Sequence, residues 1–189
     1  MASRHARPTA DVQCIVYRVT EPPDNAPPPR YVPQRSFPPY SYVPGKFPHP
    51  LSDPAGHSYG VPPVAGDDAF LQAVDLFNHG YYWEAHEAWE SLWHAAGRTG
   101  PRADFLKGLI KLAAAGVKAR EGNAAGVARH ARRAVELFTS IRGDRQEGCA
   151  LPDLIALAAA IEQAAPRLIN TSDEPVLRVF RQAIVVRDD

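Results

Sequence analysis

The stretch that decides the fold reads DDAFLQAVDLFNHGYYWEAHEAWESLWHAAG, from Asp67 to Gly97. Its apolar residues recur every three or four positions, which is typical of an amphipathic helix and not of a strand. Gly80 interrupts the pattern, and glycine often ends a helix because it accepts the backbone conformation required there. The stretch therefore predicts two helices, over 67–80 and 81–96.

The same period continues to the end of the chain. Pro101 suits the first turn of a helix, where a missing N–H costs little, and Asn123 suits an N-cap. We expect further helices over 101–121, 123–141 and 152–165, and a last short one over 176–186. Short connections favour antiparallel neighbours. The predicted fold is all-α, a compact antiparallel bundle of about five helices.

Proline marks the start of the bundle. Fifteen of the 19 prolines precede Asp67, and proline removes a backbone donor and clashes with the preceding helical turn. We therefore divide the chain into an arm, 1–66, mostly without regular structure, and a helical bundle domain, 67–189. The arm is rich in aromatic residues for a free linker. They are Phe37, Tyr40, Tyr42, Phe47 and Tyr59. We expect 38–60 to pack on the bundle as an extended strap.

Composition argues against two classes of partner. Lysine plus arginine number 21 and aspartate plus glutamate number 21, so no net charge attracts nucleic acid. A local basic run, 129–133, is interpreted as a solvated face. The apolar runs fall far short of the roughly 20 residues of a membrane span. Only two cysteines occur, Cys14 and Cys149, which fits a reducing, cytoplasmic location.

The candidate site is a group of polar residues on the second predicted helix. His86 and Glu90 lie one turn apart at the edge of a face that carries Trp89, with Glu87 beside them and Glu84 expected on the solvent side. One interpretation makes His86 and Glu90 ligands to a divalent metal, with Glu87 a further ligand or a proton acceptor. The other makes them hydrogen-bonded groups that satisfy a polar spot in the core.

These residues belong to a longer pattern that spans three helices. It reads Phe77-Asn78-x-Gly80-x-x-Trp83-Glu84-Ala85-His86-Glu87-x-x-Glu90-x-x-Trp93, then Phe105-Leu106-x-Gly108-Leu109-Ile110-x-Leu112-Ala113, then Gly122-Asn123-x-x-Gly126. The pattern resembles domain-of-unknown-function family 309, over about 67–141.

The resemblance implies an all-helical fold and the label "predicted metal-dependent hydrolase". It makes His86, Glu87 and Glu90 the polar centre. The chain departs from the family pattern at Lys107 and Lys111, where glutamine is usual, and these lysines add positive charge. The proline-rich arm resembles an extension of longer members. Its His49 and His57 either complete a metal shell over His86 or only hydrogen-bond to the bundle.

Two functional hypotheses follow. In the first, the protein is a metal-dependent hydrolase in which Glu87 is catalytic and zinc or manganese is held by His86, Glu90, His49 and His57. In the second, it is a non-enzymatic binding or scaffold module, whose groove of Trp83, Trp89 and Trp93 takes a peptide or a partner helix. A small molecule or peptide is the expected partner, and a homo-oligomer stays open.

Overall fold

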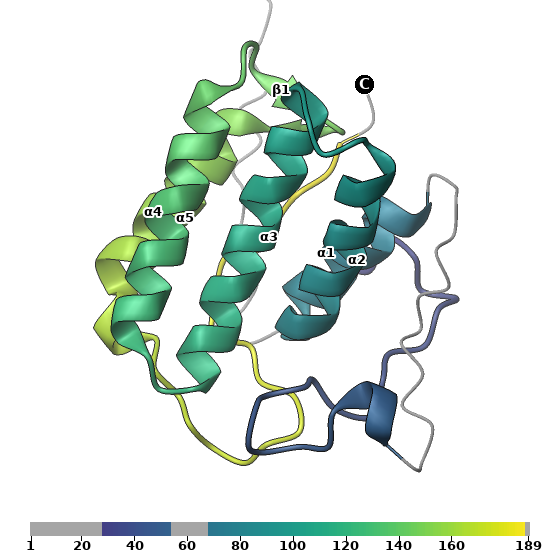
Figure 1. Cartoon of the computed structure of the whole chain (residues 1–189), viewed down its shortest axis with the longest axis vertical. Coiled ribbons are helices and arrows are strands. Elements are labelled where there is room, and N and C mark those ends of the chain that lie inside the picture. The colour runs from purple at the N-terminus through teal and green to yellow at the C-terminus, as the bar shows by residue number, and fades with distance from the viewer. Residues whose placement is uncertain (1–27, 54–67, 188–189) are drawn as a thin grey trace, which may run out of the picture.

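The computed structural model describes residues 28–53 and 68–187. Within them the elements are η1 (Pro50–Ser52), α1 (Asp68–Asn78), α2 (Tyr82–Ala95), α3 (Pro101–Arg120), α4 (Ala124–Ser140), β1 (Arg145–Gln146), β2 (Cys149–Ala150), α5 (Leu151–Ala164) and η2 (Ala165–Arg167). Each α-helix packs against the next one in the chain, and α3 lies between α2 and α4 (Figure 1). The described residues therefore form an all-α bundle of five α-helices, as predicted. None of these helices is long and apolar enough to cross a membrane.

Two glycines allow the helices around α3 to approach closely. A Cβ atom at Gly108 would lie 2.4 Å from the ring of Phe138 on α4, and one at Gly116 would lie 2.3 Å from the ring of Tyr82 on α2. Both rings are fully buried. The lack of side chains at Gly108 and Gly116 therefore leaves the space on α3 that these two aromatic rings fill.

The predicted helix boundaries coincide with visible caps. The side-chain oxygen of Asn123 accepts a hydrogen bond from the Gly126 N–H at 2.7 Å, which satisfies a backbone donor at the start of α4. Pro101 and Pro152 occupy the first turns of α3 and α5. These contacts explain why cap residues and prolines in the sequence correctly predicted where these helices begin.

The predicted last helix is wrong, because 176–186 has an extended, irregular backbone. Its polar groups bond to side chains of the bundle instead of to each other. The Tyr82 hydroxyl accepts from the N–H groups of 179–180 at 2.9 and 3.2 Å. Asn78 accepts from the Ile184 N–H at 2.8 Å and donates to the Ile184 carbonyl at 2.9 Å. The bundle thus supplies the partners that a helix would have supplied internally.

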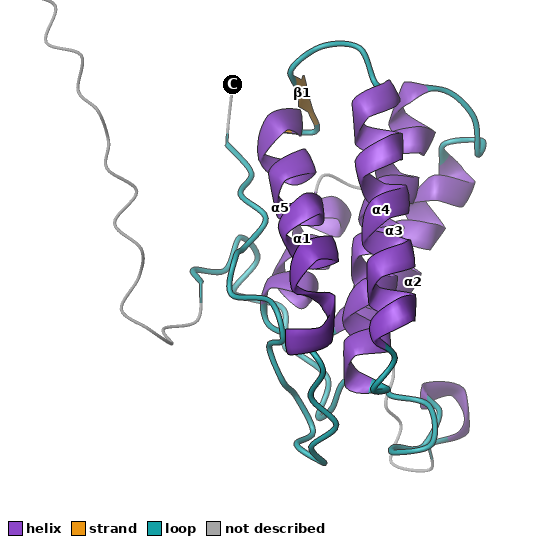
Figure 2. Ribbon diagram, turned by 90° about the vertical axis from the view of Figure 1, so that its left-hand side faces the viewer, coloured by secondary structure: helices purple, strands orange, loops and turns teal. Residues whose placement is uncertain are grey.

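The arm is held on the bundle by a buried carboxylate of α1. Asp75 is fully buried, and its two oxygens accept from the backbone N–H groups of Tyr31 and Val32, each at 2.8 Å. The ring of Phe37 then packs against the ring of Tyr81, with 4.7 Å between their centroids. Residues 28–53 therefore pack on the helices, and Figure 2 shows the loops along the outside of the bundle.

A second buried carboxylate corrects the prediction for Glu84. This side chain was expected in solvent, but only 1% of its surface is exposed. It accepts from the Tyr42 N–H and from the Ser41 hydroxyl, each at 2.8 Å. The helical pattern of α2 alone gave the wrong side because the arm covers this face.

Candidate metal site on helix α2

Helix α2 places three polar side chains at the border between core and solvent. Its apolar face carries Tyr82 and Trp89, which are fully buried. His86, Glu87 and Glu90 are half-buried beside this face. The 3.6-residue period of a helix puts residues one turn apart on the same side, so one short segment presents all three groups.

The geometry of the three groups suits a divalent cation. One donor atom from each of His86, Glu87 and Glu90 lies within 4.8 Å of the others. The His86 Nε2 and Glu90 Oε2 atoms are 4.0 Å apart, and their side chains are 27% and 41% exposed. One imidazole nitrogen and two carboxylate oxygens are donors that zinc and manganese accept. The residues present therefore fit such an ion.

The surroundings favour the neutral form of His86. Burial lowers the pKa of His86; the Glu90 charge and a hydrogen bond to the Ile110 backbone oppose this effect, and the Lys111 charge lowers the pKa further. Burial raises the pKa of Glu87, and the nearby charge of Glu90 raises it further. A carboxylate with a raised pKa is a better proton acceptor at neutral pH.

Positive groups of α3 and α4 lie near this cluster, together with His130, which the sequence analysis had assigned to a solvated basic run. Burial lowers the pKa of His130 to about 4, with further lowering by Lys111, Arg129 and Lys118. His130 is only half-exposed, so it is not simply part of a solvated basic run. The available signal was its spacing in the helical pattern, three residues after Val127 and four before Ala134.

The structure does not bring His49 to the cluster. Its ring packs edge-on against Trp83 and Tyr42, with centroid distances of 5.4 and 4.9 Å. Its Nδ1 atom accepts from the Leu51 N–H at 3.3 Å. His49 thus packs against the aromatic residues of the arm and α2. His57 lies outside the described residues.

The three tryptophans of α2 face different surroundings. Trp89 is fully buried and packs against Phe77, with 5.7 Å between ring centroids. Trp83 contacts the arm, and Trp93 lies under the Arg98 guanidinium, 5.7 Å from its ring centroid. Trp89 therefore does not line an open groove with the other two.

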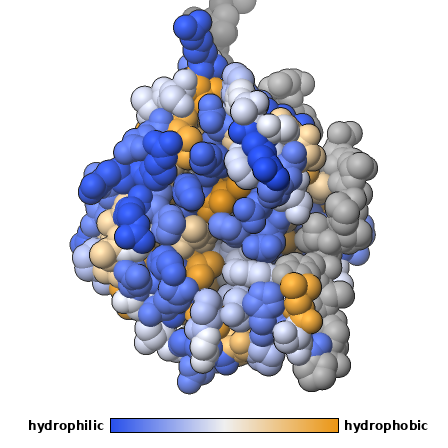
Figure 3. Space-filling model, in the orientation of Figure 1, coloured by the Kyte–Doolittle hydropathy of each residue, from blue (hydrophilic) through white to orange (hydrophobic). Residues whose placement is uncertain are grey.

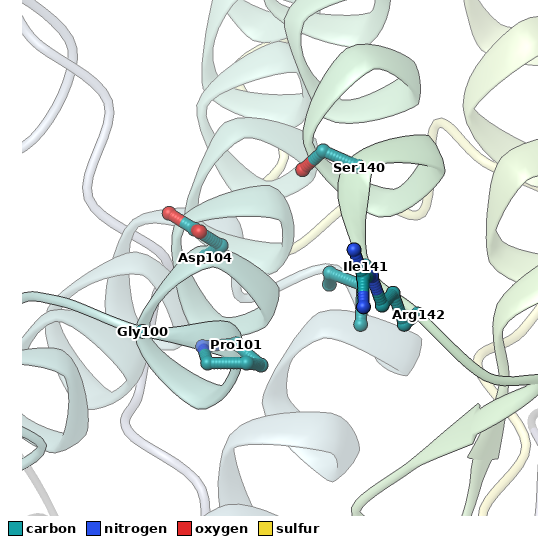
Figure 4. A pocket seen from close by; sticks show the side chains of 6 residues that line it. All are labelled: Gly100, Pro101, Asp104, Ser140, Ile141 and Arg142. Atoms are coloured by element: carbon teal, nitrogen blue, oxygen red, sulfur yellow. The ribbon is translucent and has the colours of Figure 1, made fainter.

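Two hollows on the surface lie away from the cluster. One has a volume of about 240 Å³ between the start of α3 and the end of α4, and Gly100, Pro101, Asp104 and 140–142 line it (Figure 4). The other, of about 450 Å³, lies between α5 and 182–187. Neither is lined by a residue of the candidate cluster on α2.

Comparison with known proteins agrees with the pattern in the sequence. Residues 70–130 match the family described as "Domain of unknown function (DUF309)". They include the whole of α2 and α3 and the candidate site. This part of the chain therefore belongs to that family. No curated protein matches the chain.

Proposed function

We propose that this DUF309 domain binds a divalent cation, zinc or manganese, through His86 and Glu90 and hydrolyses a small molecule or peptide with Glu87 as the proton acceptor. One observation carries the proposal. An imidazole and two carboxylates, all half-buried, have donor atoms within 4.8 Å of one another. Acidic groups on a surface are common, but this combination with a neutral imidazole is typical of metal ligands.

Each residue has a distinct task in this proposal. The cation, when bound, would polarise the substrate and acidify a water molecule. Glu87 accepts the proton of the attacking water, and its raised pKa brings it nearer the range of a general base at neutral pH. His86 offers a neutral nitrogen, and Glu90 supplies negative charge against the cation.

Cation binding is tested by thermal unfolding of the full chain with EDTA, with zinc and with manganese. A ligand at 100 times its Kd adds about 2.7 kcal/mol of stability, so the melting temperature should rise with the ion. His86→Asn and Glu90→Gln should abolish this rise. Glu136→Gln, which changes an exposed glutamate on α4, is the matched control and should keep it. Wild-type protein that melts identically under all three conditions would refute the proposal.

Catalysis is tested separately with Glu87→Gln, which keeps the shape but removes the proton acceptor. This variant should keep the cation-dependent rise in melting temperature. Its hydrolysis of model esters and phosphoesters should fall about 100-fold or more. If the variant instead lost the rise as fully as His86→Asn, Glu87 would be a ligand and not the base.

A further inference from the structure

The turn between α1 and α2 binds the main chain of segment 176–187, which lies against it in an extended, irregular conformation. The Tyr82 hydroxyl accepts from two successive N–H groups, those of 179–180. The Asn78 amide accepts from the N–H of Ile184 and donates to its carbonyl. An amide side chain can do both because it carries a donor and an acceptor. These contacts use backbone groups, so they do not depend on which side chains the segment carries.

Gly80 lies between these two residues in the sequence and allows the segment to approach closely. Its φ is +91°, and a Cβ atom there would lie 2.7 Å from the Leu177 carbonyl oxygen and 3.0 Å from the Arg178 nitrogen. A side chain at this position would therefore push the segment away. Residues Asn78, Gly80 and Tyr82 form one surface, which we call the 78–82 turn. Asn78 and Gly80 are part of the sequence pattern, but the proposed cation site uses neither.

Two apolar side chains of the segment anchor it on the bundle. Phe180 and Ile184, four positions apart, are both buried. The Phe180 ring packs against the rings of Phe77 and Tyr82, with centroid distances of 5.7 and 5.1 Å. When a protein binds an extended peptide, main-chain hydrogen bonds give affinity and pockets for side chains give specificity. The bundle binds segment 176–187 in both of these ways, as it would bind a peptide ligand.

The outer side of the segment is open. Val185 is 50% exposed, and the hollow of about 450 Å³ lies between 182–187 and α5. The residue before the segment is held separately, since the Pro175 carbonyl accepts from the Ser41 N–H at 2.9 Å. Segment 176–187 can therefore leave the 78–82 turn while Pro175 stays attached to the arm.

The conformation of the segment comes from the bundle and not from its own sequence. Its apolar residues recur every three or four positions, which is typical of a helix, and yet the structure holds it extended. Binding must therefore supply the free energy that opposes the local preference. A peptide that is already extended avoids this cost, which favours it over the resident segment.

We infer that the 78–82 turn is a binding site for an extended peptide of a partner protein, and that segment 176–187 is its intramolecular occupant. The partner peptide carries a bulky aromatic and a branched aliphatic side chain four positions apart, and it makes the same main-chain hydrogen bonds. Figure 3 shows small apolar patches among hydrophilic side chains on the face turned to the viewer. A vacated turn would expose the apolar area that Phe180 and Ile184 cover, and exposed apolar patches mark interaction sites. The inference is separate from the proposed hydrolysis.

The test is binding of a fluorescent synthetic peptide with the sequence of 175–187, PVLRVFRQAIVVR, to the full chain in EDTA, measured by fluorescence anisotropy. In Ile184→Ala the resident segment loses an anchor, so the turn is vacant in a larger fraction of molecules. This variant should bind the peptide about tenfold more tightly than the wild type, or better, because apparent affinity scales with the vacant fraction. Val185→Ala changes the exposed neighbour and is the matched control, which should bind as the wild type does.

Recognition of the main chain is tested with the same peptide carrying N-methylisoleucine in place of Ile184. This change keeps the side chain but removes the N–H from which Asn78 accepts. Affinity for the Ile184→Ala protein should fall about tenfold, as expected when a buried acceptor loses its donor. A peptide of the same composition in scrambled order should bind at least as weakly.

Three binding results would overturn the inference. They are equal affinity of the Ile184→Ala and Val185→Ala proteins for the peptide, equal affinity for the N-methylated peptide, and equal affinity for the scrambled peptide.

Hydrogen exchange of the wild type gives a further test that needs no variant. The amides of Val179, Phe180 and Ile184 should exchange at least about tenfold faster than the amide of Leu109 in the middle of α3, because the segment opens locally. Equal rates would mean that the segment leaves the turn only when the whole protein unfolds, and they too would overturn the inference.

Discussion

Asp75→Ala should loosen the arm and destabilise the whole protein. The carboxylate is fully buried and accepts two backbone N–H groups of the arm at 2.8 Å. A hydrogen bond to a charged group contributes about 1.5–3 kcal/mol. Loss of both bonds should lower the free energy of unfolding by about 3–5 kcal/mol. This is less than twice the largest value for one bond, because water can reach the part-buried Tyr31 N–H but not the buried Val32 N–H. Asp75→Asn keeps one acceptor oxygen and should cost about half as much.

Urea unfolding measures these losses, and limited proteolysis reports where they act. In Asp75→Ala, cleavage within 28–53 should become faster than in the wild type. Asp68→Ala, an exposed change on the same helix, should cost less than about 1 kcal/mol. A loss below 1 kcal/mol in Asp75→Ala, or a larger loss without faster cleavage of the arm, would refute this account of how the arm is held.

Two further perturbations test the described packing. Burial raises the pKa of Glu84 from 4.5 to about 7. The protonated Glu84 side chain therefore stabilises the folded protein fully below pH 4.5, and this stabilisation is lost as the pH rises through 7. The total loss should be about 3 kcal/mol. Unfolding at a series of pH values should show this decline, and Glu84→Gln should flatten it; an unchanged slope in the variant would assign the decline to another group. Gly116→Ala should lower the free energy of unfolding by about 1–3 kcal/mol, because its Cβ would lie 2.3 Å from the fixed ring of Tyr82. Gly126→Ala should cost less, since its nearest contact, at 2.9 Å, is the flexible side chain of Lys118, and equal costs would contradict the packing argument.

The helices were predictable because their signals are local. Apolar spacing, Asn123 as a cap and Pro101 in a first turn act within one or two turns of the chain. The extended backbone of 176–186 was not predictable in this way. Its conformation depends on Tyr82 and Asn78, about a hundred positions earlier in the sequence. Contacts with such distant residues produce no periodic pattern within the sequence of 176–186.

The same distinction applies to the candidate site. His86, Glu87 and Glu90 share one helix, so their spacing alone brought them together. The burial of Glu84 was missed because the groups that cover it come from the arm. The proximity of His130 to the site was missed because it requires α4 to pack beside α3.

The carboxylates that hold the arm accept hydrogen bonds from its backbone at three positions, besides their contacts with the side chains of Ser41 and Arg30. Tyr31, Val32 and Tyr42 each donate a main-chain N–H to a buried oxygen. Proline has no such donor. This contact therefore permits substitution of these three residues by any amino acid except proline. Proline is the commonest residue of this segment. The positions without proline therefore determine which backbone N–H groups can bond to the bundle, and so how the arm is aligned on it.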